Sequence, residues 1–115
     1  MTNYQEITTT DMLDEILKSS EQQPILFFKH SKTCGVSSRA FAEFQRYLQS
    51  PESAQVRNCL IVIQQARDVS NELARLIGVQ HESPQAIIVR EGRAVWNESH
   101  FTLESGALIE AVRKT

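Results

Sequence analysis

The sequence has few of the features that mark secreted, membrane-spanning or nucleic-acid-binding proteins. Its 115 residues include only two cysteines, too few for the disulfide framework of a small secreted domain. Lys and Arg number 12 against 14 Asp and Glu, so the basic excess that a nucleic-acid surface or an anionic membrane requires is missing. These counts predict a protein with reduced thiols and with no nucleic-acid or membrane partner.

Targeting segments and long apolar stretches are also missing. The opening MTNYQEITTT has neither the positive charge nor the apolar stretch of a signal peptide, and no apolar run approaches the roughly 20 residues that cross a bilayer. We therefore expect a cytoplasmic location. Repeats and linkers are absent too, and 115 residues suffice for one core but not two, so residues 1–115 are predicted to form one domain.

Apolar patterns predict strands and helices in alternation, which is typical of an α/β fold. A helix between two buried strands indicates a parallel crossover, and a Glu91-Gly92 turn between apolar runs indicates an antiparallel hairpin. We expect a central mixed sheet of about four strands flanked by helices, with a short N-terminal strand as an optional fifth. The predicted elements are a weak strand at 4–7, a helix capped by Thr10, a buried strand at 25–28, a helix from Cys34 to about Gln49, a buried strand at 59–63, a helix capped by Ser70 and ended by Gly78, a hairpin of strands 86–89 and 94–96, and a last helix capped by Thr102.

Cys34 falls at the turn between the strand at 25–28 and the helix that follows. Unpaired amides and the dipole at a helix start favour negative charge, which lowers a thiol pKa and increases the reactive thiolate fraction. The alternative is a buried cysteine that serves as a small apolar residue, but the polar neighbours Lys32, Thr33 and Ser37 favour a turn. Because Ser37 stands where a Cys-x-x-Cys oxidoreductase carries its second cysteine, the sequence predicts a one-thiol redox site.

Neighbouring side chains are candidates for tuning this thiol. Ser37 either donates a hydrogen bond to the thiolate or simply adds polarity to a helix start. Three histidines without a metal-binding spacing predict no metal site, and we interpret His30 and His100 as structural. The cations near Cys34 either make the site electropositive or belong to the ordinary surface, and they are Lys29, His30, Lys32 and Arg39.

Cys59 is the other thiol and is predicted to be an inert core residue. We expect it to begin its strand level with Ile25, whereas Cys34 lies beyond the end of the first strand. At about 3.3 Å per residue, their separation would be on the order of 20 Å, too far for a disulfide. Cys34 is thus expected to have no resolving partner in the chain.

A strand-helix-strand unit, a hairpin and a closing helix, with a cysteine after the first buried strand, resemble the thioredoxin fold. That resemblance implies a cis peptide bond at Ser83-Pro84, in the loop that faces the active cysteine. Pro84, Ser83 and Gln85 would shape the groove for a mixed disulfide. His81 either lines this cleft or is an ordinary loop residue.

KHSKTC at 29–34 and HESPQ at 81–85 resemble the monothiol bacilliredoxins, thioredoxin-like proteins of the bacillithiol redox system, and the resemblance covers nearly the whole chain. It implies that Cys34 removes bacillithiol from client proteins, with bacillithiol as co-substrate and no bound cofactor. The malate carboxylates of bacillithiol would meet Lys29, Lys32 or Arg39. The family usually has Pro-Ile after the cysteine, whereas this chain has Gly35 and Val36, a difference expected to affect helix stiffness and sulfur tuning.

Two other functions remain open. Cys34-Gly35-Val36-Ser37 differs at one position from the Cys-Gly-Phe-Ser motif of monothiol glutaredoxins, which hold an iron-sulfur cluster with glutathione. That class carries a Gly-Gly pair and acidic residues after the hairpin, whereas this chain has Trp-Asn-Glu-Ser-His at 96–100. A non-enzymatic adaptor with a thioredoxin shape is the third alternative.

Overall fold

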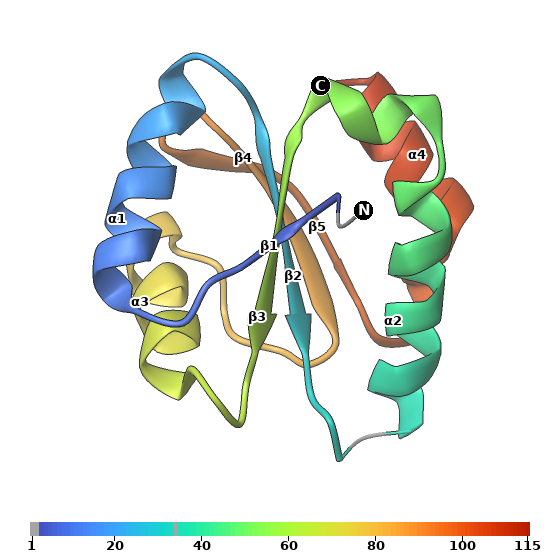
Figure 1. Ribbon diagram of the computed structural model, residues 1–115, viewed down its shortest axis with the longest axis horizontal. Coiled ribbons are helices and arrows are strands. Elements are labelled where there is room, and N and C mark those ends of the chain that lie inside the picture. The colour runs from blue at the N-terminus through green and yellow to red at the C-terminus, as the bar shows by residue number, and fades with distance from the viewer. Residues whose placement is uncertain (1–2, 34) are drawn as a thin grey trace.

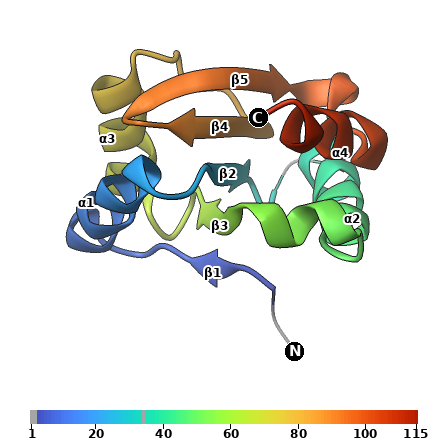
Figure 2. The same ribbon diagram turned by 90° about the horizontal axis from the view of Figure 1, so that it is seen from above.

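A computed structural model describes residues 3–33 and 35–115, which form a five-stranded sheet between two layers of helices (Figures 1 and 2). The strands lie in the order β1-β3-β2-β4-β5, with β1 and β5 at the edges. The weak strand predicted at 4–7 is present, so the sheet has one strand more than the expected four. The elements are β1 (Gln5–Glu6), α1 (Thr10–Lys18), β2 (Ile25–His30), α2 (Gly35–Leu48), β3 (Arg57–Val62), α3 (Arg67–Ile77), β4 (Gln85–Arg90), β5 (Arg93–Ser99) and α4 (Ser105–Arg113).

The central strand β2 is buried along its whole length, because helices cover both faces of the sheet (Figure 2). It runs parallel to β3 and antiparallel to β4, which makes the sheet mixed as predicted. Successive side chains of a strand point to opposite faces. Leu26 and Phe28 accordingly pack in the core with α2 and α4, while Ile25 and Phe27 pack in the core with α1 and α3.

Two predicted helix caps are wrong, one by a single residue and the other by four residues. The cap of α1 is Thr9 rather than Thr10, since the Thr9 side chain accepts a hydrogen bond from the Met12 backbone N–H at 3.1 Å. Helix α3 begins at Arg67, so Ser70 lies inside it and is buried. The Ser70 hydroxyl lies 3.0 Å from Nδ1 of His81, in the loop that follows α3.

The final helix also begins later than predicted. Thr102 lies in a short 3₁₀ turn, His100–Thr102, and α4 starts at Ser105. Instead of capping the helix, the Thr102 hydroxyl donates to Glu98 Oε2 at 2.6 Å and to the Ser99 carbonyl at 2.8 Å. A threonine before an apolar helix is therefore not always its cap.

The end of α3 and the hairpin form as predicted. Gly78 ends α3 with φ of 68°, a left-handed conformation that glycine adopts without strain. Glu91 and Gly92 both have positive φ in the two-residue link between β4 and β5, as a tight hairpin turn requires. The register between these strands shifts at Ile88/Val89, so β5 carries a bulge. Among the described residues, no helix has the length and apolar character needed to cross a membrane.

Candidate active site

The candidate active site lies where β2 ends and α2 begins. Cys34 is outside the described residues, so the site is defined by the residues on either side of it and by the loops that approach them. In the parallel pair β2 and β3, His30 is level with Val62, and the chain then leaves the sheet. The Ser31–Thr33 segment leads into Cys34 from this point.

Ser37 is fully buried in the first turn of α2, and its hydroxyl has partners. Its Oγ accepts a hydrogen bond from the Ser31 backbone N–H at 2.8 Å and lies 3.2 Å from Nδ1 of His30. It is therefore more than a polar residue at a helix start, because it joins the helix to the segment before Cys34. A hydrogen bond from Ser37 to the thiolate stays a prediction.

His30 is buried beside Ser37, and its ring stacks on Phe41 with 4.6 Å between centroids. Burial lowers the pKa of His30 because it disfavours the charged imidazolium. The hydrogen bond with Ser37 raises the pKa of His30, whereas the positive charge of Lys32 lowers it further. His30 thus favours the neutral form, in which Nδ1 can accept the Ser37 proton or donate its own.

Gln64, in the link after β3, contacts all three residues that precede Cys34. Its Oε1 accepts from the Lys32 backbone N–H at 3.1 Å. Its Nε2 donates to Ser31 Oγ at 2.8 Å and to Thr33 Oγ1 at 3.2 Å. Thr33, one of the polar neighbours that predicted a turn before the helix, is therefore part of this hydrogen-bonded group. Sequence reasoning missed Gln64, since its partners are more than thirty positions away along the chain.

Lys29 was named among the cations that would meet the malate carboxylates of bacillithiol, but in this structure it does not reach the surface. Its side chain is fully buried, and Nζ lies 3.2 Å from the Ser70 carbonyl and 3.2 Å from Nδ1 of His81. Successive side chains of a strand point to opposite faces of the sheet, so Lys29 points away from the face of Phe28 and His30. Its side chain therefore faces α3. Burial lowers the pKa of Lys29 to about 8, since the charged ammonium loses its hydration.

His81 is half-buried, and its ring nitrogen Nδ1 points toward the buried Lys29 ammonium. Its Nδ1 also lies 3.0 Å from Ser70 Oγ. Burial lowers the pKa of His81, the charges of Lys29 and Arg67 lower it further, and Glu82 opposes them. An unprotonated Nδ1 accepts from the ammonium, so His81 supports the loop in which it lies.

Lys32 and Arg39 are exposed, as substrate-binding cations must be. Arg39 lies on the solvent side of α2. With the Gln65 amide oxygen turned toward it, Lys32 Nζ donates to Gln65 at 2.7 Å, and the Gln65 nitrogen then donates to Glu6 at 2.9 Å. Gly35 is exposed at the first position of α2, next to half-buried Val36.

The Ser83-Pro84 bond is cis, as the thioredoxin resemblance implied. Gln85 follows it, but its side chain is buried: Oε1 accepts from the Glu82 N–H at 3.3 Å and Nε2 donates to the Gln80 carbonyl at 3.1 Å. The buried amide of Gln85 thus holds the cis-proline loop together, and its role in shaping the groove stays a prediction. The buried Ser83 Oγ has no hydrogen-bond partner among the described residues.

Cys59 is fully buried in β3. It pairs with Phe27 rather than with Ile25 as predicted, because β3 already begins at Arg57, two residues earlier. Burial raises the pKa of the Cys59 thiol to about 12, and the charge of Arg57 opposes this only weakly. At neutral pH it therefore stays a thiol and a poor nucleophile. The chain has two cysteines, so Cys34 is the one left for exchange.

Residues 5–108 match the family model of monothiol bacilliredoxin BrxC, which covers most of the chain. The chain belongs to the monothiol bacilliredoxin family. The match extends from β1 into α4, so it includes the helix start after Cys34, the Gln64 link and the cis-proline loop. This bacilliredoxin assignment confirms the resemblance seen in KHSKTC and HESPQ.

Solved structures confirm that the bacilliredoxin chain has the thioredoxin fold. A protein described as having this fold shares 28% sequence identity, with a TM-score of 0.81 over 95% of this chain and 93% of its own. Thioredoxin from Malassezia sympodialis is 11% identical with a TM-score of 0.79 over 99% and 91% of the two chains. Thioredoxin from Fasciola hepatica is 14% identical, with 0.74 over 96% and 97%.

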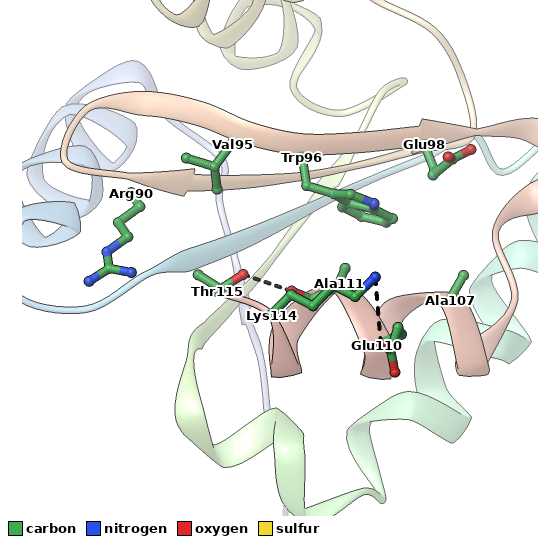
Figure 3. Close-up of a pocket in the computed structure, with 9 residues that line it drawn as sticks. All are labelled: Arg90, Val95, Trp96, Glu98, Ala107, Glu110, Ala111, Lys114 and Thr115. Atoms are coloured by element: carbon green, nitrogen blue, oxygen red, sulfur yellow. Dashed lines mark hydrogen bonds and ion pairs between the residues drawn. The ribbon is translucent and has the colours of Figure 1, made fainter.

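A cavity of about 550 Å³ lies away from this bacilliredoxin site, between β5 and α4 (Figure 3). The Trp96 ring lies over it from β5, and the cavity is also lined by Ala111 of α4 and by Lys114, which follows the end of that helix. It shares no lining residue with the group around Ser37, Gln64 and Pro84. Within the described segments, no group of three His, Cys, Asp or Glu side chains is placed to bind a metal.

Proposed function

We propose that this protein is a monothiol thiol-disulfide oxidoreductase that removes bacillithiol from protein mixed disulfides through Cys34. The burial and raised pKa of Cys59 carry this proposal, because they exclude the other thiol of the chain from exchange. Membership of the bacilliredoxin family supports bacillithiol as co-substrate. Bacillithiolated proteins of the cytoplasm are the clients that this proposal implies.

In the proposed reaction, the Cys34 thiolate attacks the bacillithiol sulfur of the mixed disulfide. The client–bacillithiol S–S bond breaks as the Cys34–bacillithiol bond forms, and the client leaves as a thiolate. A second thiol must then attack the bacillithiol sulfur on Cys34. That step transfers bacillithiol to the second thiol and frees the Cys34 thiolate, so each exchange conserves electrons.

Lys32 and Arg39 are the cations proposed to meet the malate carboxylates, because both are exposed and both lie within five residues of Cys34 in the sequence. Lys29 acts differently, since its buried ammonium bonds to the Pro84 loop through His81. Ser83 and Pro84 would border the groove that receives the mixed disulfide.

The test compares two model clients, one carrying bacillithiol and one carrying glutathione. We expect faster removal of bacillithiol, and complete loss of both reactions in Cys34→Ala. Intact mass after incubation with oxidised bacillithiol should show one adduct, absent in Cys34→Ala. Activity that persists in Cys34→Ala contradicts the mechanism, equal rates contradict the bacillithiol preference, and a coloured purified protein favours a cluster carrier.

Charge variants test recognition. Lys32→Ala and Arg39→Ala should each reduce the bacillithiol preference by about fivefold, because an exposed ion pair contributes at most on the order of 1 kcal/mol. The effect should shrink at high salt. Arg46→Ala, an exposed arginine farther along α2, is the matched control. A preference that survives in the Lys32→Ala, Arg39→Ala double variant removes these cations from the proposal.

A further inference from the structure

Gln64 extends the contact between β2 and β3 beyond the end of the sheet. The last paired residues are His30 and Val62, and the Ile63 N–H still donates to the His30 carbonyl at 2.9 Å. Lys32 and Gln64 each stand two residues further on. At this position the link between the two segments is made by the Gln64 side chain and not by a backbone carbonyl, because Gln64 Oε1 accepts a hydrogen bond from the Lys32 N–H.

In the segment before Cys34, the backbone N–H groups of Ser31 and Lys32 donate to side chains from two other elements. Ser37 of α2 accepts the Ser31 N–H, and Gln64 accepts the Lys32 N–H. The Gln64 amide nitrogen then joins the hydroxyls of Ser31 and Thr33, which lie 3.3 Å apart. One side chain therefore constrains three consecutive residues, and the next residue in the chain is Cys34.

We propose that Gln64 is a positioning residue that fixes the 31–33 turn so that the thiolate of Cys34 attacks disulfides in line. The inference rests on the proposed exchange through Cys34. In disulfide exchange the attacking, central and leaving sulfurs must align, so a small displacement of the nucleophile costs rate. Alkylation by a small reagent such as iodoacetamide requires the thiolate but not the three-sulfur alignment. Loss of Gln64 should therefore slow exchange more than alkylation.

The experiment measures both rate constants against pH and compares their plateaus at high pH, where the thiol is fully ionised. In Gln64→Ala, the exchange plateau with a bacillithiolated client should fall about tenfold, while the iodoacetamide plateau stays within twofold of the unmodified protein. Gln45→Ala is the matched control, because Gln45 is exposed on α2. It should change neither plateau.

Gln64→Glu supplies the rescue. A carboxylate accepts hydrogen bonds from the Lys32 N–H and from both hydroxyls, so the geometry and the exchange plateau should return to within twofold of the unmodified protein. Its negative charge should raise the thiol pKa and move both pH profiles upward. Urea unfolding of each variant confirms that the folded fraction is complete under assay conditions.

An exchange plateau in Gln64→Ala equal to that of Gln45→Ala overturns the inference. An equal fall in exchange and alkylation also overturns it, because that pattern means lost access rather than lost alignment. The proposed function is judged separately on the unmodified protein. If that protein alkylates at Cys34 but exchanges no disulfide, the function fails before any variant is compared.

Discussion

Buried polar side chains lie at both ends of the central strands β2 and β3, and the two groups differ in their chemistry. At the start of β3, Tyr47 donates to Asn58 Oδ1 at 2.8 Å, and Asn58 Nδ2 donates to the Ser53 carbonyl at 2.9 Å. Burial raises the pKa of Tyr47 well above its usual value, so it remains a donor. The hydrogen-bonded group of Tyr47, Asn58 and Ser53 is neutral, and its hydrogen bonds have fixed directions.

The other end, next to the candidate active site, holds titratable groups. Lys29 and His30 are consecutive, point to opposite faces and both have lowered pKa values. Their hydrogen bonds with His81 and Ser37 depend on which atom carries the proton. The neutral group at the start of β3 stabilises the packing of α2, whereas the other end places groups that can gain or lose a proton around the segment that leads to Cys34.

The largest expected effect is the pH dependence of stability at Lys29. Its pKa is lowered from 10.5 to about 8, so between these values the unfolded chain binds the proton that the folded protein has lost. Stability therefore rises with pH in this window. The unfolding free energy of the unmodified protein minus that of Lys29→Met should increase by about 3 kcal/mol from pH 7 to pH 11, as measured by urea unfolding.

Lys18→Met is the control for Lys29, because Lys18 is exposed on α1. It should leave the pH dependence of the unfolding free energy unchanged, because the Lys18 side chain lies in solvent. A flat difference for Lys29→Met would show that the ammonium reaches water and that the two ends of the strands are alike.

Removing the neutral network should cost stability without changing its pH dependence. Asn58→Ala leaves the Tyr47 hydroxyl buried and unpaired, and we expect a loss of about 2 kcal/mol at every pH from 6 to 10. Asn97→Ala, at an exposed position of β5, should change stability little. A loss that varies with pH would contradict the neutral character of this end. The exchange rate of folded Asn58→Ala should be unaffected.

The smallest expected effect is at Cys59, which lies in β3 between the two ends. Because Cys59 is buried and has a raised pKa, Cys59→Ala should leave the exchange rate within twofold. Iodoacetamide at neutral pH should label one cysteine in the folded protein and two in urea, as counted by peptide mass spectrometry. An intramolecular disulfide in the oxidised, folded protein would contradict the placement of β3.

Sequence patterns predicted the sheet better than they predicted the site. The apolar run that includes Phe27 and the turn at Gly92 depend on local chemistry, so strands and hairpin were foreseeable. Lys29 was misjudged because its polar partner, His81, lies 52 residues away, and a lysine at a strand end usually reaches water. Gln64 gave no local signal at all. Ser70 has the residue type of a helix cap, but its hydroxyl pairs with His81, which lies 11 residues later in the loop after α3.

The outer strands of the sheet affect how readily copies of this protein associate with one another at high concentration. An outer strand with a long row of free amides and carbonyls can pair with the same strand of another molecule and begin aggregation. Here β1 is only two residues long, and β5 has a bulge opposite Ile88 and Val89 and begins with a charged arginine. Short length, a bulge and charge each oppose edge-to-edge pairing. The irregular outline of the sheet thus opposes self-association of this protein through its outer strands.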